Sequence, residues 1–457
     1  FIFRSLDSID KSVIYSIESA VIKWSHQVQV VLKRESSQLL LQWENATPRV
    51  ELEFWKNRYE DLDYIYNQLR TIKVRGMAGL LDKLQSSYFP AFKAMFRDVA
   101  AALTEAQDIH AHLMPLHRHL ETIQSVEFPK VKPRLRPLLH VVCLIWATCK
   151  DYRSPGRLTV LLQEICNLLI QQASTYLSPE DLLRSDVEES QRKLQVVADT
   201  LSFFKEVFKD RRENLHTYFK ENQEVREWDF QSSLVFVRLD GFLRRLHLVE
   251  DLLRTTLDFH KLEKLEFSSI RGNALSQQVR RMYDEFQDMY RVFSESSYDC
   301  LDPQRMEFEN DISEFNRRVE DLDRRLGTVF IQAFDDVPGL EHAFKLLDIA
   351  GNLLERPLVA QDVCDKYLVL IRMFSQDLDV VRMIYNQHVQ EEAELGFAPV
   401  HKNMPAVAGG LRWVQELRQR IQGPVSNFRH LTHPCMESAE GKRMIQKYED
   451  TLSLLEK

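Results

Sequence analysis

Glycine and proline are scarce in this sequence, at 13 and 15 residues among 457. Folds built from β-strands need more of both residues in their tight turns. Hydrophobic residues make up 44% of the chain and charged residues 28%, which is ample for sizeable cores and atypical of a disordered chain. The composition therefore predicts an all-α protein with long helices and short connections.

Signatures of catalysis and nucleotide binding are missing as well. The sequence contains no phosphate-binding loop of the form GxxxxGK[ST], no GxGxxG, no HExxH and no GxSxG. We therefore expect no catalytic residue, no cofactor-binding residue and no metal ligand, and we expect that this chain is not an enzyme. The sequence does not indicate which residues bind partners.

The charge balance and the apolar runs argue against two classes of partner. The formal net charge is −8, so there is no positive excess for a phosphate backbone, and nucleic-acid binding is disfavoured. The apolar runs Leu138–Trp146 and Leu158–Ile170 are shorter than the roughly 18 residues that span a membrane, and the second contains Gln163 and Glu164. Both runs predict buried core helices, and no membrane partner is expected.

Six cysteines are present and none forms a CxxC pair; they are Cys143, Cys149, Cys166, Cys300, Cys364 and Cys435. The first three lie in or beside apolar segments, where a buried, reduced thiol is the usual state. This pattern fits a reducing compartment such as the cytoplasm.

The best candidate for a metal site is a group of four histidines: His110, His112, His117 and His119. Helix positions two apart point about 200° away from each other, so the four cannot share one face. Pro115 is expected to break the segment, and the nearby Asp108 and Glu121 do not complete a tetrahedral ligand set. Ordinary helix and turn histidines are the favoured interpretation.

Basic residues cluster at three places: Lys130 to Arg136 in alternation with prolines, Arg280-Arg281, and Arg324-Arg325. The neighbouring acidic residues favour solvated surface and ion pairs between helix positions three or four apart. The alternative is electrostatic contact with an acidic partner.

Apolar residues recur at helical spacing in three stripes: Ile312, Phe315, Val319, Leu322, Leu326 and Val329; Phe242, Leu246, Val249 and Leu253; and Leu411, Val414, Leu417 and Ile421. Intervals of three and four predict one buried face on each helix. The stripes are too short for a long parallel coiled coil, so they favour antiparallel bundles.

Turn signals divide the chain. Three prolines between Phe128 and Pro137 predict an extended connector, Ser178-Pro179 predicts a helix start, and turns are expected at 271–273, 302–303 and 335–339. A loop over 401–410 should precede a helix that begins at Leu411 and ends at Gly423-Pro424. We expect an N-terminal helical bundle or bundles over 1–128, a proline-rich connector over 129–137, central bundles over 138–300 and C-terminal bundles over 301–457. Together these form an elongated series. Because the chain begins at Phe1 and ends within a helical pattern, we expect it to be part of a longer protein.

Three motifs, in order along the chain, resemble one family. They are LLHVVCLIW from Leu138 to Trp146, followed by Tyr152, Pro155 and LTVLLQEICNLLI; DFHKLEKLEF from Asp258 to Phe267, followed by Arg271-Gly272; and MPAVAGGLRWV from Met404 to Val414. The set resembles the N-terminal tail of axonemal dynein heavy chains, and is most similar to the outer-arm beta type. In the second motif Phe259, Leu262 and Leu265 predict an apolar stripe. In the third, Trp413 is placed to lock the preceding turn.

The resemblance implies consecutive helical bundles in a tail that precedes the motor, and a parent chain that is a microtubule motor ATPase. It also implies the partners: a second dynein heavy chain, WD-repeat intermediate chains and docking proteins on doublet microtubules, in the axoneme of a cilium or flagellum. Our hypothesis is therefore a non-catalytic scaffold. Two rivals from other classes are a helical-rod subunit of a vesicle-tethering complex and a hydrolase with an unrecognised site.

Overall fold

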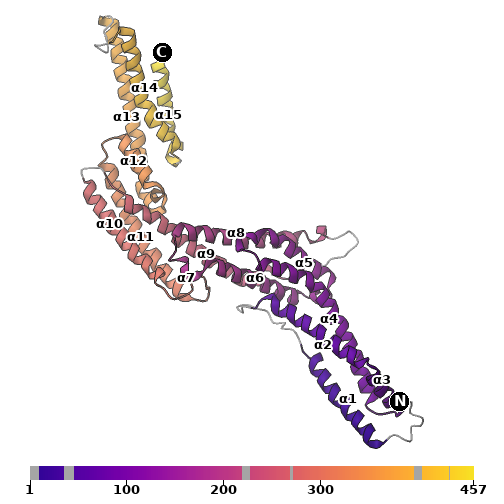
Figure 1. Cartoon of the computed structure of the whole chain (residues 1–457). Coiled ribbons are helices and arrows are strands. Elements are labelled where there is room, and N and C mark those ends of the chain that lie inside the picture. Colours follow the sequence, from indigo (N-terminus) through magenta and orange to yellow (C-terminus); the bar gives the residue numbers. More distant parts are fainter. Residues whose placement is uncertain are drawn as a thin grey trace. The chain divides into compact units, whose positions relative to one another are not determined.

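The structure, a computed structural model, describes residues 10–34, 46–218, 227–267, 271–395, 404–431 and 433–456. Over these ranges the regular elements are fifteen α-helices and several short 3-10 helices, without a β-strand (Figure 1). The predicted all-α class is thereby confirmed. Within the same ranges, no helix combines the length and hydropathy needed to cross a bilayer.

Contacts divide the chain into two compact units. Unit 1 comprises residues 1–250 and 299–305, and unit 2 comprises residues 251–298 and 306–457. Helix α9 (Ser232–His260) contributes residues to both. This division differs from the expected boundaries, because both sides of residue 128 lie in unit 1 and residue 300 lies within the short segment 299–305.

Unit 1 contains, besides the first part of α9, the helices α1 (Lys11–Leu32), α2 (Pro48–Leu69), α3 (Ile72–Lys83), α4 (Phe89–Gln124), α5 (Leu135–Thr148), α6 (Pro155–Leu177), α7 (Pro179–Leu182) and α8 (Val187–Glu213). Helices α1 to α4 share an apolar core that includes Val21, Leu69, Leu81 and Val99. Every residue from Leu158 to Ile170 in α6 is buried, as are most residues of α5. Both apolar runs are therefore core helices, as predicted.

The three-proline segment is not the extended connector that the sequence predicts. It forms two 3-10 helices, η2 (Phe128–Lys130) and η3 (Lys132–Arg134), which lead directly into α5. Each has a proline within its first two positions, where no backbone N–H is needed. Phe128, Val131 and Leu135 are buried, and both turns contact α8. The missing N–H groups of the prolines are therefore accommodated in tight helical turns, and these turns pack into the core.

Two prolines expected to end helices lie inside them. Helix α4 runs through Pro115, and α14 (Ala406–His430) runs through Pro424 and begins before Gly409-Gly410. The expected starts and ends of these helices were therefore wrong, although residues 401–403 lie outside the described ranges. A proline removes one backbone hydrogen bond. Buried side chains on both sides of each proline, such as Leu113 and Leu116 in α4, hold the helix together.

Unit 2 contains, besides the end of α9, the helices α10 (Gly272–Ser294), α11 (Met306–Asp335), α12 (Leu340–Ala350), α13 (Pro357–Leu395), α14 and α15 (Ala439–Glu456). Helix α11 packs against α10 and α13, and α13 packs against α15 (Figure 1). The predicted turn at 302–303 lies between α10 and α11, the turn predicted over 335–339 starts at the last residue of α11 and ends before α12, and Arg271 directly precedes α10.

The predicted apolar stripes are largely confirmed. All six residues of the α11 stripe and all four of the α9 stripe are buried. In α14 the stripe is displaced: Leu411 is 62% exposed, and the buried face consists of Leu417, Ile421, Val425 and Phe428. Because α14 continues past Pro424, its packed face can extend toward the C-terminal end.

The stripe at Phe259, Leu262 and Leu265 is also buried. Its interval of three follows from η6 (Lys261–Lys264), a 3-10 helix in which positions three apart lie on the same side. Phe259 stacks on Phe286 of α10, with ring centroids 4.5 Å apart. The Arg356 guanidinium lies over the Phe259 ring. It also forms a bidentate ion pair with Asp323 of α11, in which Nε and Nη2 donate to the two carboxylate oxygens at 2.6 and 2.8 Å.

Candidate functional site

Helix α1 presents apolar side chains on the side away from its core. Val21 and Val28 are buried, whereas Tyr15, Ile22 and Val30 are 74%, 48% and 52% exposed. Steps of seven and eight residues place these three on one side of the helix, roughly opposite the buried valines. Tyr15, Ile22 and Val30 are called the α1 apolar face below. Exposed apolar groups that share a face are typical of protein-binding surfaces.

Trp413 does not lock the turn before α14. It lies well inside α14, where its ring stacks at 6.2 Å on Tyr385 and meets His388 edge-on at 4.6 Å, both on α13. The third motif thus joins α14 to α13. Val407 and Leu411, one turn apart in α14, are exposed.

The basic clusters are mostly paired. Lys130 lies 2.8 Å from Glu127, Arg325 lies 2.8 Å from Glu285, and Arg280 lies 3.3 Å from Glu266. Lys132 and Arg136 both lie over the Phe203 ring, each 5.4 Å from its centroid. These contacts support the interpretation that the basic clusters are surface residues paired with other side chains of the same chain.

A polar cluster is buried where α2 meets α6. The Glu51 carboxylate accepts hydrogen bonds from Trp55 Nε1 and from the Tyr152 hydroxyl, each at 2.8 Å. Glu164 is only 6% exposed, and its Oε2 accepts no hydrogen bond from the described residues. Burial, reinforced by the charge of Glu51, raises the pKa of Glu164 to about 8. This carboxyl is therefore mainly protonated at neutral pH.

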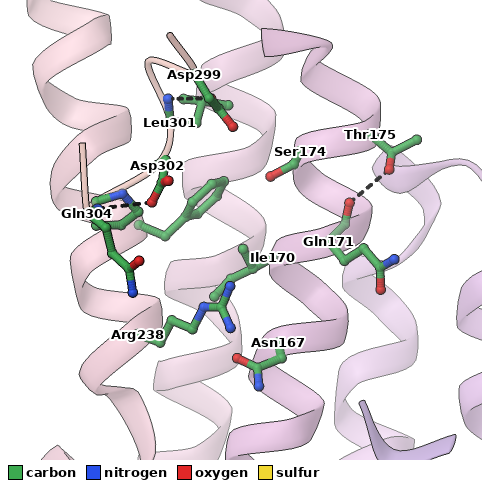
Figure 2. A pocket seen from close by; sticks show the side chains of 12 residues that line it. Asn167, Ile170, Gln171, Ser174, Thr175, Arg238, Asp299, Leu301, Asp302 and Gln304 are labelled. Carbon is green, nitrogen blue, oxygen red and sulfur yellow. Dashed lines mark hydrogen bonds between the residues drawn. The ribbon is translucent and has the colours of Figure 1, made fainter. Parts of the chain in front are cut away.

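A polar cavity of about 430 Å³ lies within unit 1 (Figure 2). Its walls come from α6, α9 and residues 299–304, and they include Asn167, Arg238 and Asp299. Two short turns shape the last wall, because Asp299 accepts from the Leu301 N–H at 2.8 Å and Asp302 accepts from the Gln304 N–H at 2.9 Å. The cavity carries charges of both signs, so it favours no simple ligand class.

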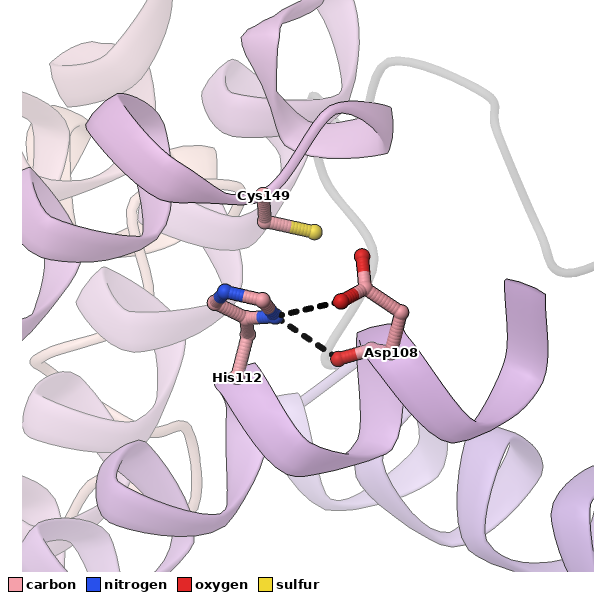
Figure 3. Close-up of side chains that lie close together, drawn as sticks. All are labelled: Asp108, His112 and Cys149. Carbon is pink, nitrogen blue, oxygen red and sulfur yellow. Dashed lines mark hydrogen bonds and ion pairs between the residues drawn. The ribbon is translucent and has the colours of Figure 1, made fainter. Parts of the chain in front are cut away.

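The four histidines of α4 do not converge. His110 stacks on Tyr59 of α2, with centroids 5.4 Å apart, and His117 pairs with Glu121 at 3.5 Å. His112 instead lies beside Asp108 and Cys149, and one ligand atom from each of these three residues lies within 4.8 Å of the others (Figure 3). Sequence reasoning missed this cluster because Cys149 reaches it only through the packing of α5 on α4.

All six cysteines are free thiols, and only Cys364 is exposed. The expected burial of Cys143, Cys149 and Cys166 is confirmed. Burial raises the pKa of Cys143 to about 12, and it also raises the pKa of Cys149.

Comparison with known proteins gives a consistent assignment. Residues 14–457 match the family described as dynein heavy chain, N-terminal region 1. The chain is 83% identical over 452 residues to human dynein axonemal heavy chain 9, and 47% identical over 456 residues to the ciliary dynein beta chain of Heliocidaris crassispina. It is 33% identical over 452 residues to the flagellar outer-arm dynein beta chain of Chlamydomonas reinhardtii.

These alignments cover 98% or 99% of this chain but 10% of each relative, so the chain spans about a tenth of their length. The match extends through all three motifs and both structural units, and it favours the dynein hypothesis over the tethering-rod and hydrolase alternatives. The chain belongs to the dynein heavy-chain family and corresponds to its N-terminal tail region.

Proposed function

We propose that this chain is a non-catalytic scaffold in the tail of an axonemal outer-arm dynein heavy chain of the beta type, and that it works in the axoneme of a cilium or flagellum. The relatives named above, described as axonemal, ciliary or flagellar outer-arm chains, support this location. The motor ATPase activity would belong to the rest of the parent chain.

The observation that carries the scaffold proposal is the α1 apolar face. A packed helical unit can present a binding surface, and α1 offers a surface of this kind with Tyr15 as its most exposed aromatic residue. We assign this face to association with a second dynein heavy chain. WD-repeat intermediate chains and docking proteins of the doublet microtubule are the further expected partners.

The test is co-purification of the 457-residue chain with a partner heavy-chain tail and intermediate chains expressed together. A charge placed in an apolar interface is costly to desolvate, so the double variant Tyr15→Glu and Ile22→Glu should reduce recovery of the partner heavy chain at least tenfold. Tyr64→Glu is the matched control, because Tyr64 is 66% exposed on α2 and lies outside the α1 apolar face.

Circular dichroism should show equal helix content in the three proteins. If the wild-type chain recovers neither a heavy chain nor intermediate chains, the scaffold proposal is wrong. If it recovers them and the double variant does so equally well, the assignment of α1 is wrong.

A further inference from the structure

Three side chains of different donor type meet in unit 1. Asp108 and His112 lie one turn apart on α4, and Cys149 directly follows α5. Their ligand atoms, a carboxylate oxygen, an imidazole nitrogen and a sulfur, all lie within 4.8 Å of one another. Figure 3 shows the Cys149 sulfur facing the side chains of Asp108 and His112.

The donor set selects the kind of ion. Thiolate, imidazole and carboxylate together are typical ligands of Zn²⁺, at bond lengths of about 2.0–2.3 Å. Ca²⁺ and Mg²⁺ prefer oxygen ligands alone. Three protein ligands leave one of the four tetrahedral positions for water or for a ligand from another molecule.

Hydrogen bonding already orients one of the ligands. The Nδ1 of His112 lies 2.7 Å from the carbonyl oxygen of Asp108, and because a carbonyl only accepts, Nδ1 donates. The same Nδ1 lies 3.5 Å from the Asp108 carboxylate, so it is the ring nitrogen on the side of that ligand (Figure 3). A metal bound at this nitrogen requires the ring proton to move to Nε2 and the hydrogen bond to the carbonyl to break.

The site is reachable from solvent. The side chain of Asp108 is 50% exposed and that of His112 is 28% exposed, whereas Cys149 is fully buried. An ion can therefore enter from the Asp108 side and meet the sulfur at the inner end.

Helix α4 carries a second histidine–carboxylate pair, which can be compared with Asp108 and His112. His117 and Glu121 are also four residues apart, with the same 3.5 Å separation of Nδ1 and carboxylate oxygen. No cysteine joins that pair among the described residues. The cysteine supplied by the end of α5 is thus the feature that distinguishes the two pairs.

We propose that Asp108, His112 and Cys149 form a Zn²⁺ site that ties α4 to the segment after α5 and leaves one coordination position open. This site is independent of the α1 apolar face and of the proposed scaffold function. Partner association and metal binding can therefore fail or succeed separately.

The experiment titrates the metal-free 457-residue chain with Co²⁺ and then with Zn²⁺. Cobalt reports the ligands directly, because a thiolate–cobalt bond gives a charge-transfer absorption band in the near ultraviolet. The expected result is one cobalt per chain with this band, displaced by Zn²⁺. A rise in melting temperature with Zn²⁺ should accompany it, because a ligand that binds only the folded state stabilises it.

Variants locate the site. Cys149→Ser should abolish the band, and the surface change Asp108→Asn and the change His112→Ala should each weaken Zn²⁺ binding at least tenfold. The matched controls, His117→Ala and Cys143→Ser, should bind as the wild type does. Asp108→Asn alters an exposed side chain and keeps the test valid if Cys149→Ser fails to fold.

Three outcomes would overturn the proposal. They are the absence of a thiolate–cobalt band in the wild type, a band that persists in folded Cys149→Ser, and equal loss of binding in His112→Ala and His117→Ala.

Discussion

Glu164 lies in an environment that its sequence position does not indicate. It follows Gln163 in an apolar run, and the run alone predicts only that the helix is buried. The fold buries its carboxyl, and this burial, reinforced by the nearby charge of Glu51, raises its pKa to about 8. The unfolded chain would ionise the same group near 4.5, so ionisation favours the unfolded state between these two pH values.

The sign of the effect on stability follows directly. Below pH 4.5 the carboxyl is protonated in both states and the penalty is absent. As the pH rises toward about 8, the unfolded state loses its proton while the folded state keeps it, so the free energy of unfolding falls. At pH 7 the penalty is about 3 kcal/mol, at 1.36 kcal/mol for each pH unit above the unfolded pKa.

We predict that Glu164→Gln raises the free energy of unfolding at pH 7 by about 2–3 kcal/mol. The glutamine is neutral at every pH, so the gain should shrink toward zero at pH 4. Urea denaturation of unit 1 at pH 4, 6, 7 and 8 measures this difference. Glu60→Gln, an exposed change on α2, is the control and should leave the pH profile unaltered. An equal gain at pH 4 and pH 7 would refute the explanation.

At the scale of elements, one glycine marks a close approach between α11 and α13. A Cβ at Gly327 would lie 3.1 Å from Cβ and 3.2 Å from Cγ of Asp362 on α13, closer than ordinary contacts allow. The two helices therefore approach at this point because no side chain separates them. Gly410 in α14 differs, because a Cβ there would meet no atom within 4 Å.

These two glycines should respond in opposite ways to the same change. Gly327→Ala is expected to destabilise unit 2 by about 1–3 kcal/mol through overpacking. Gly410→Ala is expected to stabilise it by about 0.5–1 kcal/mol, because alanine loses less conformational entropy in a helix. Thermal and urea denaturation of the two variants beside the wild type measure both effects. A stabilising Gly327→Ala would show that Asp362 moves aside without cost.

Helix ends illustrate where sequence reasoning succeeds and where it stops. The α9 and α11 stripes were predicted residue by residue, because a buried face of a regular helix has a fixed period. Pro115 and Pro424 were expected to end helices and do not. A proline costs local hydrogen bonding, but the burial of neighbouring apolar side chains decides whether the helix continues.

At the scale of the whole molecule, the fold leaves one of six thiols accessible. Cys364 on α13 is exposed, and the other five cysteines are buried. The sequence indicates buried thiols only for the three in or beside apolar segments. The number of accessible thiols therefore reports whether both units are fully folded.

We predict that a water-soluble thiol reagent labels one cysteine per native chain rapidly and all six after unfolding. Cys364→Ser should remove the rapid reaction without changing the total helix content. Rapid labelling of two or more thiols in the native chain would contradict the described packing. Mass spectrometry of the labelled peptides identifies the cysteine in each case.

The sequence by itself determined the all-α class, the absence of nucleotide-binding loops and the likeness to dynein tails. These follow from composition, helical period and ordered motifs, all of which are local along the chain. Only the tertiary structure decided that Cys149 joins Asp108 and His112, that Glu164 is buried near the charge of Glu51, and that the proline-rich segment packs on α8. The reason is physical: each of these depends on which helices lie against one another, and that is set by the burial of apolar surface summed over whole units.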